Sequence, residues 1–251
     1  MSVTVTDVSA TGPLTHDEAM PLQAVELERT LELLRALSDS DWHAQTECPD
    51  WDVHRMYLHV LGACEAAASM RENVHQMVAG KRHQKREGGP LEAGLSAVQV
   101  RERLDLSPAQ LVERLTAIAP VTVRKRTKLP APVRRIGMKI DGPVVEKWRL
   151  GYLVDTIYLR DLWMHRVDAS RATGRELVLT AEHDGRIVAD VVAEWARRHG
   201  QPIMLTLTGP AGGRFRSGDG GETIELDAVE FCRTLAGRVE GTGLLATIVP
   251  F

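Results

Sequence analysis

The amino-acid sequence predicts an α+β protein in which a four-helix bundle is followed by a small α+β domain. Up to about residue 172, apolar residues recur at close to the helical period of about 3.6. After Arg175, short β-branched runs alternate with Gly-rich turns and one amphipathic segment. The 251 residues suffice for one large domain or two modest ones. We expect a tail over residues 1–14, a helical bundle over 15–172 and an α+β domain over 173–251.

The composition is that of a soluble globular protein. Hydrophobic residues make up 43% of the chain and charged residues 26%, and the formal net charge is −3. This balance gives no indication of nucleic acid or membrane as a partner, and no apolar run approaches the roughly 20 residues of a membrane span. The N-terminus lacks the basic and apolar regions of a signal peptide. Three widely spaced cysteines argue against a disulfide framework or a zinc ribbon and favour a reducing cytoplasm.

The first half of the predicted bundle contains three helical segments. Residues 15–37 have apolar positions at nearly helical spacing and end in the turn-forming cluster SDSDW. A second helix is expected from about Asp52 to near Val78, with Asp50 as its cap and Gly80 as its stop. The stretch KRHQKREGG is interpreted as a polar connector, and LEAGLSAVQVRERL as the third helical segment.

The second half of the bundle is expected to contain two helices separated by a basic segment. Ser107-Pro108 predicts a capped helix start, and this helix is expected to stop before Pro120. Residues 121–140 carry seven basic and no acidic residues and are interpreted mainly as a solvated loop. Steering of an anionic ligand and nucleic-acid binding remain alternatives, although aromatic residues for base stacking are missing. A long helix is expected to follow Gly142-Pro143 and to stop near Gly174.

The C-terminal segment predicts alternating strands and helices. Strands are expected over 176–180, 202–209 and 244–251, and a Gly-rich hairpin over 211–227. The amphipathic segment over 181–200 predicts a helix ending at Gly200, and residues 227–238 predict a short helix.

Three polar residues continue the apolar stripe of the last bundle helix. Leu150, Val154, Ile157 and Tyr158 form the stripe, and its continuation falls on Asp161, His165 and Asp168. Asp161 and His165 are four residues apart, so both face one side of the helix. A carboxylate and an imidazole at this spacing can reach the same cation.

A histidine interrupts the stripe of the second helix in the same way. Met56, Ala63, Ala66 and Met70 define the inward stripe, and His59 falls on it. Packing of the two stripes would bring His59 to Asp161 and His165, and bundle cores commonly hold such metal sites.

An ordinary alternative requires no metal. A histidine on an apolar stripe is usually a core residue that is hydrogen-bonded to backbone, and Asp161 can simply pair with Arg160 or Arg166. Trp51 and Trp163, each close to an expected ligand, are interpreted as packing residues at the rim of the core.

The motifs CPDWDVHRMYLHVLG and RDLWMHRVDAS resemble those of the mycothiol-dependent maleylpyruvate isomerase family. That family belongs to the DinB/YfiT-like metal-binding four-helix bundles. The C-terminal run LTGPAGG…EFCRTLAGR…GLLATIVPF is similar to the family's small C-terminal domain. The resemblance extends over nearly the whole chain after residue 15.

The resemblance implies a divalent-metal site, with zinc as the expected metal. The family's ligands fall on His59, Asp161 and His165, although the usual acid is Glu and the shorter Asp161 withdraws the carboxylate by one methylene. Asp168 is implied to orient His165 or to place substrate. The alternative for Asp168 is an exposed helix-end ion pair with Arg166 or Arg171.

The resemblance further implies mycothiol as a thiol cofactor and a small electrophile as the substrate. A metal lowers the pKa of a thiol, and the thiolate is the nucleophile. Carboxylates of such a substrate need cationic partners, for which Arg238 and Arg233 are the candidates. Two other functions stay open: a non-enzymatic metal- or ligand-binding regulatory module, and a structural bundle without metal.

Overall fold

The computed structural model describes residues 4–140 and 145–251, and the chain divides into two compact units. Residues 16–176 form one unit, which we call the helical unit. Residues 1–15 and 177–251 form the other, which we call the mixed unit. One unit is mostly helical and the other combines a sheet with helices, so the predicted α+β class is confirmed.

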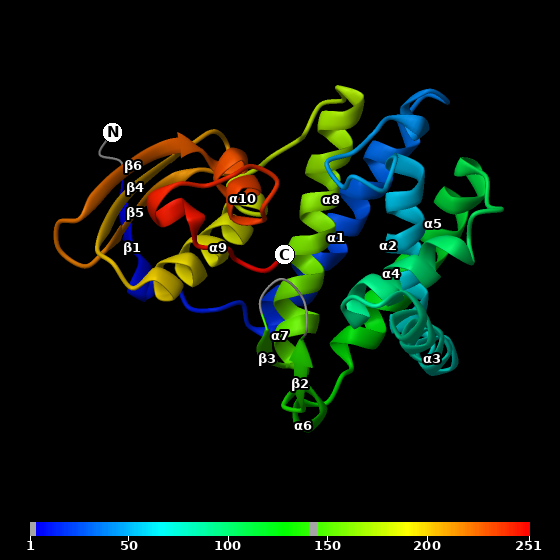
Figure 1. Ribbon diagram of the computed structural model, residues 1–251. Helices are drawn as coiled ribbons and strands as arrows, with labels where there is room; N and C mark the ends of the chain where they lie inside the picture. The colour runs from blue at the N-terminus through cyan, green and yellow to red at the C-terminus, as the bar shows by residue number, and fades with distance from the viewer. Residues whose placement is uncertain (1–3, 141–144) are drawn as a thin grey trace. The chain divides into compact units, whose positions relative to one another are not determined.

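The helical unit is built from long helices and a short hairpin (Figure 1). Its elements are, in chain order, α1 (His16–Arg35), α2 (Val53–Ala68), α3 (Met70–Glu87), α4 (Leu91–Arg101), α5 (Pro108–Thr127), α6 (Ala131–Arg134), β2 (Gly137–Ile140), β3 (Glu146–Arg149), α7 (Leu150–Tyr152), a π-helical turn (Leu153–Ile157) and α8 (Tyr158–Thr173).

The predicted second helix is in fact two helices. Ser69 has extended backbone angles, and its hydroxyl accepts a hydrogen bond from the backbone N–H of Glu72, so it caps α3. The break leaves Met70, expected on the inward stripe, 78% exposed. The cap of α2 is Asp52 rather than Asp50, because the Asp52 carboxylate accepts from the N–H of Arg55 at 2.8 Å.

Gly80 does not end a helix, and the expected polar connector is the last part of α3. A Cβ on Gly80 would lie 2.8 Å from Cδ2 of Leu95, and one on Gly94 would lie 2.7 Å from the carbonyl oxygen of Gly80. The two glycines therefore allow α3 and α4 to pack closely, which is a tertiary role.

Helix α5 begins at Pro108 as predicted, with a Ser107 capping box, but it continues through Pro120 to Thr127. Proline inside a helix removes one hydrogen bond and costs about 3 kcal/mol. The face formed by Leu115, Ala119 and Thr122 is buried, and the Thr122 hydroxyl donates to the carbonyl oxygen of Cys64 at 2.8 Å. Packing against α2 therefore offsets the cost.

The basic segment 121–140 is not a solvated loop, because it contributes to α5, α6 and β2. Arg126 is buried, donates to Oε1 of Gln23 at 2.8 Å, and lies 4.3 Å from the ring centroid of Tyr158. The aliphatic stem and the guanidinium of Arg126 therefore make their contacts inside the helical unit.

The last bundle helix starts later than predicted. Residues 146–149, expected to be helical, form β3, which pairs antiparallel with β2. Gly142 and Pro143, the expected start, lie outside the described residues. The helix ends at Gly174 with φ of +66°, as predicted.

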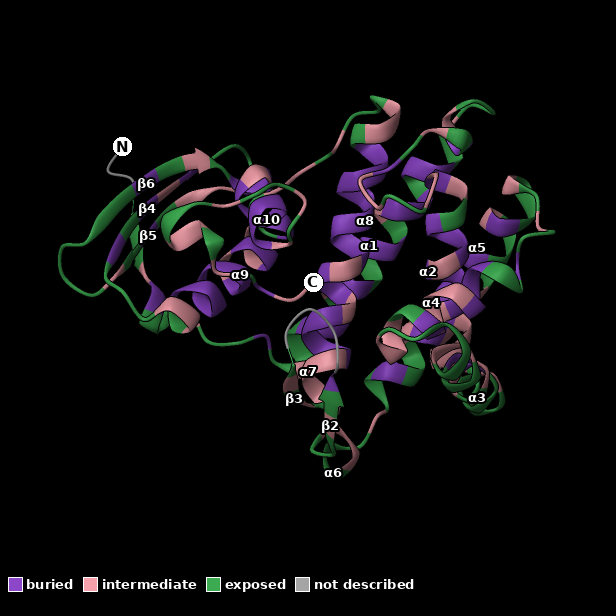
Figure 2. Ribbon diagram, in the orientation of Figure 1, coloured by how far each residue is buried: buried purple, intermediate pink, exposed green. Residues whose placement is uncertain are grey.

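Helix α8 is buried along most of its length, whereas α3 is mainly exposed (Figure 2). Polar residues at buried positions of α8 need partners on neighbouring helices. Glu26 on α1 accepts from Arg166 at 2.5 Å and 3.1 Å, and both side chains are almost fully buried. This bidentate ion pair joins α1 to α8 in the core.

The mixed unit is a four-stranded sheet with two helices over one face (Figure 1). In β4, Ile203, Leu205 and Leu207 are buried and alternate with more exposed residues, as expected for a sheet with one covered face. The strand order is β1-β5-β4-β6, with β5 antiparallel and β6 parallel to β4. The elements are β1 (Val5–Asp7), a 3-10 turn (Val8–Ala10), α9 (Asp184–His199), β4 (Ile203–Thr208), β5 (Gly213–Ser217), β6 (Glu222–Asp227), α10 (Ala228–Leu235) and a second 3-10 turn (Gly243–Ala246).

Four predictions for the mixed unit require correction. The expected tail, residues 1–14, contributes β1, which pairs in parallel with β5. The strands expected over 176–180 and 244–251 do not form; the second segment contains a 3-10 turn instead. The expected hairpin is wrong, because both β5 and β6 pair with β4 and not with each other. Helices α9, with its cap at Gly200, and α10 are as predicted.

Within the described residues, no helix is both long and apolar enough to cross a membrane. In the part of the chain that the structure describes, Cys48, Cys64 and Cys232 form no disulfide bond.

We expect Glu26→Gln to lower the free energy of unfolding by about 3–5 kcal/mol, because Arg166 would keep a buried charge without its counter-ion. Urea denaturation followed by circular dichroism measures this change. Arg55→Gln, which breaks the exposed pair with Asp52, is the matched control and should cost less than about 1 kcal/mol. Equal stability of Glu26→Gln and the wild type would contradict the structural role of the ion pair.

Candidate metal centre

His59 is positioned by a chain of hydrogen bonds that starts on the neighbouring helices. Its Nδ1 lies 2.7 Å from Oε1 of Gln99 on α4, and Nε2 of Gln99 donates to Oε1 of Gln76 on α3 at 2.8 Å. Gln76 in turn donates to the carbonyl oxygen of Gly62 at 2.9 Å. Because an amide oxygen only accepts, Nδ1 of His59 donates to Gln99, and this hydrogen bond fixes the ring so that Nε2 lies on the opposite side.

Trp51 stacks on the imidazole of His59. The ring centroids are 5.1 Å apart, with an interplanar angle of 29°. The His165 ring lies 5.6 Å from the His59 ring in an edge-to-face arrangement, and 6.4 Å from Trp51. Trp51 therefore covers one face of the His59 imidazole. Trp163, in contrast, is fully buried as a core residue.

Asp161 lies between the two imidazoles. Its Oδ1 is 3.3 Å from Nε2 of His165, and its Oδ2 is 3.9 Å from Nε2 of His59. One turn of α8 separates Asp161 from His165, whereas His59 comes from α2. The structure thus brings together the three residues selected from the sequence, whereas Arg166 pairs with Glu26.

Charge and burial act in opposite directions in this group. Burial by itself would raise the pKa of the Asp161 carboxyl, but the charge of His165 and hydrogen bonds with His165 and His59 lower that pKa far below its usual range. Burial would lower the pKa of His165, but the adjacent Asp161 carboxylate raises it well above the ordinary value. Both shifts have the same origin, which is the attraction between the Asp161 carboxylate and the His165 ring.

Asp168 and Cys48 face the other side of the His165 ring. Oδ2 of Asp168 lies 3.6 Å from Nδ1 of His165, and the Cys48 thiol donates to the same oxygen at 3.8 Å. Asp168 is fully buried, so its interpretation as an exposed helix-end ion pair is wrong. Tyr57, whose pKa is raised by burial, donates to the carbonyl oxygen of His165 at 3.3 Å.

The donor set suits a divalent cation. Two ligands held about 2.1 Å from a tetrahedral zinc lie about 3.4 Å apart, and the separations between Asp161 and the two histidines are close to this value. The facing nitrogen and oxygen atoms of His59, Asp161 and His165 all lie within 4.8 Å of one another. Within the described chain, both ring nitrogens of His165 are buried without a hydrogen bond of good geometry. A buried imidazole nitrogen without a well-formed hydrogen bond is suited to bind a metal ion.

Two residues of this group were not expected from the sequence. Cys48 was counted among three widely spaced cysteines and was not selected for the site, although its place in the CPDW motif directly before α2 was a usable signal. Gln99 had no signal, because its partner His59 is 40 residues away and on another helix.

The two arginine candidates lie in the mixed unit. Arg233 is buried on α10 and forms an ion pair with Glu230. The backbone N–H of Arg238, just after α10, donates to the carbonyl oxygen of Arg233 at 2.9 Å.

Comparison with known proteins gives one family and two solved structures. The family described as mycothiol maleylpyruvate isomerase N-terminal domain matches residues 24–170. Crystal structures of the mycothiol-dependent maleylpyruvate isomerase, in one case with a histidine replaced by alanine, align with a TM-score of 0.57 and 14% identity. Each alignment covers 94% of this chain and 93% of the other, and shows a shared fold. A search of curated proteins found no match.

We expect Gln99→Leu to weaken zinc binding by about 10- to 100-fold, because the His59 ring would lose the acceptor that fixes its tautomer and orientation. Isothermal titration calorimetry with zinc measures the affinity. Gln84→Leu is the matched control, because Gln84 on α3 donates to Gly89 and has no contact with His59. The same affinity for both variants would show that Gln99 does not position the ligand.

Proposed function

This chain belongs to the family of the mycothiol maleylpyruvate isomerase N-terminal domain, and on that basis we propose that it is a metal-dependent enzyme that uses mycothiol. The proposed reaction is the isomerisation of a small electrophile or the transfer of the thiol to it. The observation that carries the proposal is the convergence of His59, Asp161 and His165. The proposed location is the cytoplasm, where low-molecular-weight thiols are kept reduced.

His59, Asp161 and His165 would hold the cation, which we propose to be zinc. When bound, a divalent cation supplies Lewis acidity and lowers the pKa of a thiol that approaches it. Two imidazoles and one carboxylate leave positions open for another ligand, as in catalytic sites. Gln99 and Asp168 orient the two imidazoles, and Trp51 covers one face of the His59 ring.

Asp161 replaces the glutamate that is usual in the family. Its carboxylate lies between the two histidines although its side chain is shorter, and the side chain is 35% exposed. The open side next to this carboxylate is the side from which we propose that thiol and substrate approach.

Arg238 is the proposed partner for a substrate carboxylate. Arg233 is less suited to this role, because its guanidinium is buried and paired with Glu230. An arginine can bind a carboxylate through two parallel hydrogen bonds, which would also orient the substrate.

Zinc content tests the centre directly. We expect His59→Ala and His165→Ala to lose bound zinc, because each removes one of three ligands, and Asp161→Glu to retain it, because the acid keeps its charge. Mass spectrometry of the metal in purified protein gives the stoichiometry, with His75→Ala on exposed α3 as the control. Equal zinc in all variants would eliminate the centre.

Turnover tests the activity. We expect conversion of maleylpyruvate to its trans isomer to require both zinc and mycothiol, and Arg238→Gln to lower kcat/KM by about 10- to 100-fold through loss of a charge-assisted hydrogen bond. Nuclear magnetic resonance distinguishes the cis and trans acids, and Arg214→Gln on β5 is the control. Zinc binding without thiol-dependent turnover of this or related electrophiles would instead indicate a non-enzymatic binding module.

A further inference from the structure

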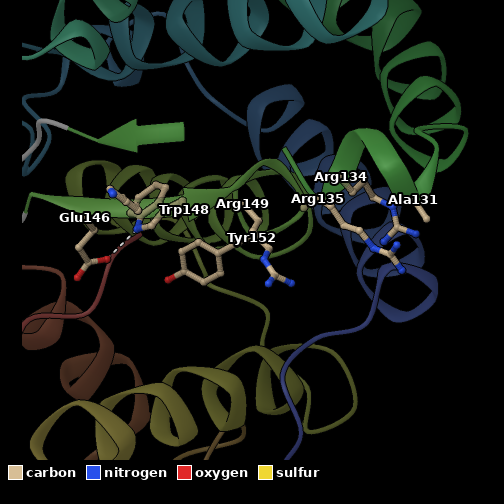
Figure 3. Close-up of a pocket in the computed structure, with 9 residues that line it drawn as sticks. Ala131, Arg134, Arg135, Glu146, Trp148, Arg149 and Tyr152 are labelled. Atoms are coloured by element: carbon tan, nitrogen blue, oxygen red, sulfur yellow. Dashed lines mark hydrogen bonds between the residues drawn. The ribbon is translucent and has the colours of Figure 1, made fainter. Parts of the chain in front are cut away.

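A second concave site lies at the hairpin end of the helical unit, apart from the residues of the metal centre. Its cavity volume is about 530 Å³, which is within the range of small-molecule sites, about 300–1,000 Å³. We call it the basic pocket (Figure 3). It is lined by Ala131, Arg134, Arg135, Glu146, Lys147, Trp148, Arg149, Gly151 and Tyr152.

The hairpin and α6 give the basic pocket a defined shape. Strands β2 and β3 pair from Gly137 opposite Arg149, and the N–H of Leu150 donates to the carbonyl oxygen of Ile136 at 2.8 Å. A Cβ on Gly151 would lie 3.2 Å from the carbonyl oxygen of Arg134. Glycine at 151 therefore allows α6 to pack against α7, which places Arg134 and Arg135 beside β3.

Positive charge dominates the lining. Glu146 is the one carboxylate among the nine lining residues, and it accepts from Nε1 of Trp148 at 2.7 Å. Beneath the pocket, Asp155 lies 2.6 Å from Nδ1 of His16 and 3.6 Å from a guanidinium nitrogen of Arg134. These acids are therefore already engaged.

Three cations of the lining remain available to a ligand. Arg135, Lys147 and Arg149 are exposed, and across residues 4–140 and 145–251 their side chains form no ion pair. In the same part of the chain, Nε of Arg134 is buried without an acceptor. Figure 3 shows the guanidinium groups of Arg135 and Arg149 on the same side of the hairpin, with the Tyr152 ring near Arg149.

Two aromatic rings, arranged edge to face, add apolar ring faces to the lining. The Trp148 and Tyr152 centroids are 5.2 Å apart with an interplanar angle of 76°. The hydrogen bond to Glu146 holds the indole in place. Such rings favour a ligand with a planar group, while the arginine forks favour carboxylate or phosphate oxygens.

We propose that the basic pocket binds an organic anion that carries two negative charges on or beside a planar ring, independently of the metal centre. Carboxylates and phosphate esters share this chemistry. The site goes beyond the proposed catalytic function, because its residues include none of the metal ligands.

Isothermal titration calorimetry on the full-length, metal-free protein tests the proposal, with phthalate and phenyl phosphate as probes and neutral benzamide as the ligand control. We expect at least one dianion to bind, and Arg135→Gln/Arg149→Gln to weaken that binding by about tenfold or more. The variant Arg124→Gln/Lys125→Gln, which removes two exposed charges of α5 outside the pocket, should bind like the wild type. Tighter binding of phthalate would identify the ligand as a carboxylate, and tighter binding of phenyl phosphate would identify it as a phosphate ester.

His59→Ala should also bind like the wild type, which separates this site from the metal centre. Absence of binding by both dianions at millimolar concentration, equal binding of benzamide, or the same affinity in the Arg135→Gln/Arg149→Gln variant would each overturn the proposal. Circular dichroism confirms that this variant is folded. Binding of a single-stranded oligonucleotide whose affinity rises with its length would also overturn it, because it would indicate a nucleic-acid surface.

Discussion

The burial of α8 is the constraint on which the helical unit depends. Arg160, His165, Arg166 and Asp168 are all almost fully buried on this one helix. A buried polar group without a partner costs a large part of the stability of a domain, so each side chain must meet a complementary group from elsewhere. Arg166 meets Glu26 on α1, and Asp168 meets Cys48 in the loop before α2. These pairings fix which face of α8 each neighbouring helix contacts.

At the candidate metal centre this pairing is incomplete. The two ring nitrogens of His165 face carboxylates on either side without a well-formed hydrogen bond, and His59 directs its Nε2 toward Asp161. A cation bound there would satisfy the Nε2 atoms of both histidines together. The chain of amides from Gln76 through Gln99 links the packing of α3 and α4 to the orientation of His59. Close contact at Gly80 and Gly94 is therefore part of what holds the centre together.

The basic pocket and the metal centre depend on different parts of one continuous helical segment. The pocket uses its start at Gly151 and Tyr152, whereas the centre uses Asp161 and His165. Between them lies the π-helical turn Leu153–Ile157, where Gln23 on α1 donates to the carbonyl oxygen of Val154 at 2.6 Å. Irregular helical turns of this kind often occur near functional sites, and here the turn lies between two polar regions.

The sequence by itself determined the fold class, the caps at Ser107, Gly174 and Gly200, and the three residues that meet in the candidate centre. These features are local, because capping chemistry and helical periodicity involve only residues a few positions apart. Tertiary structure alone decided the break at Ser69, the passage of α5 through Pro120, and the pairing of β4 with both β5 and β6. It also placed Gln99 beside His59 and Cys48 beside Asp168. Contacts between distant segments bury apolar area and satisfy polar groups, and this gain outweighs local propensity. A single sequence contains no local signal for such contacts.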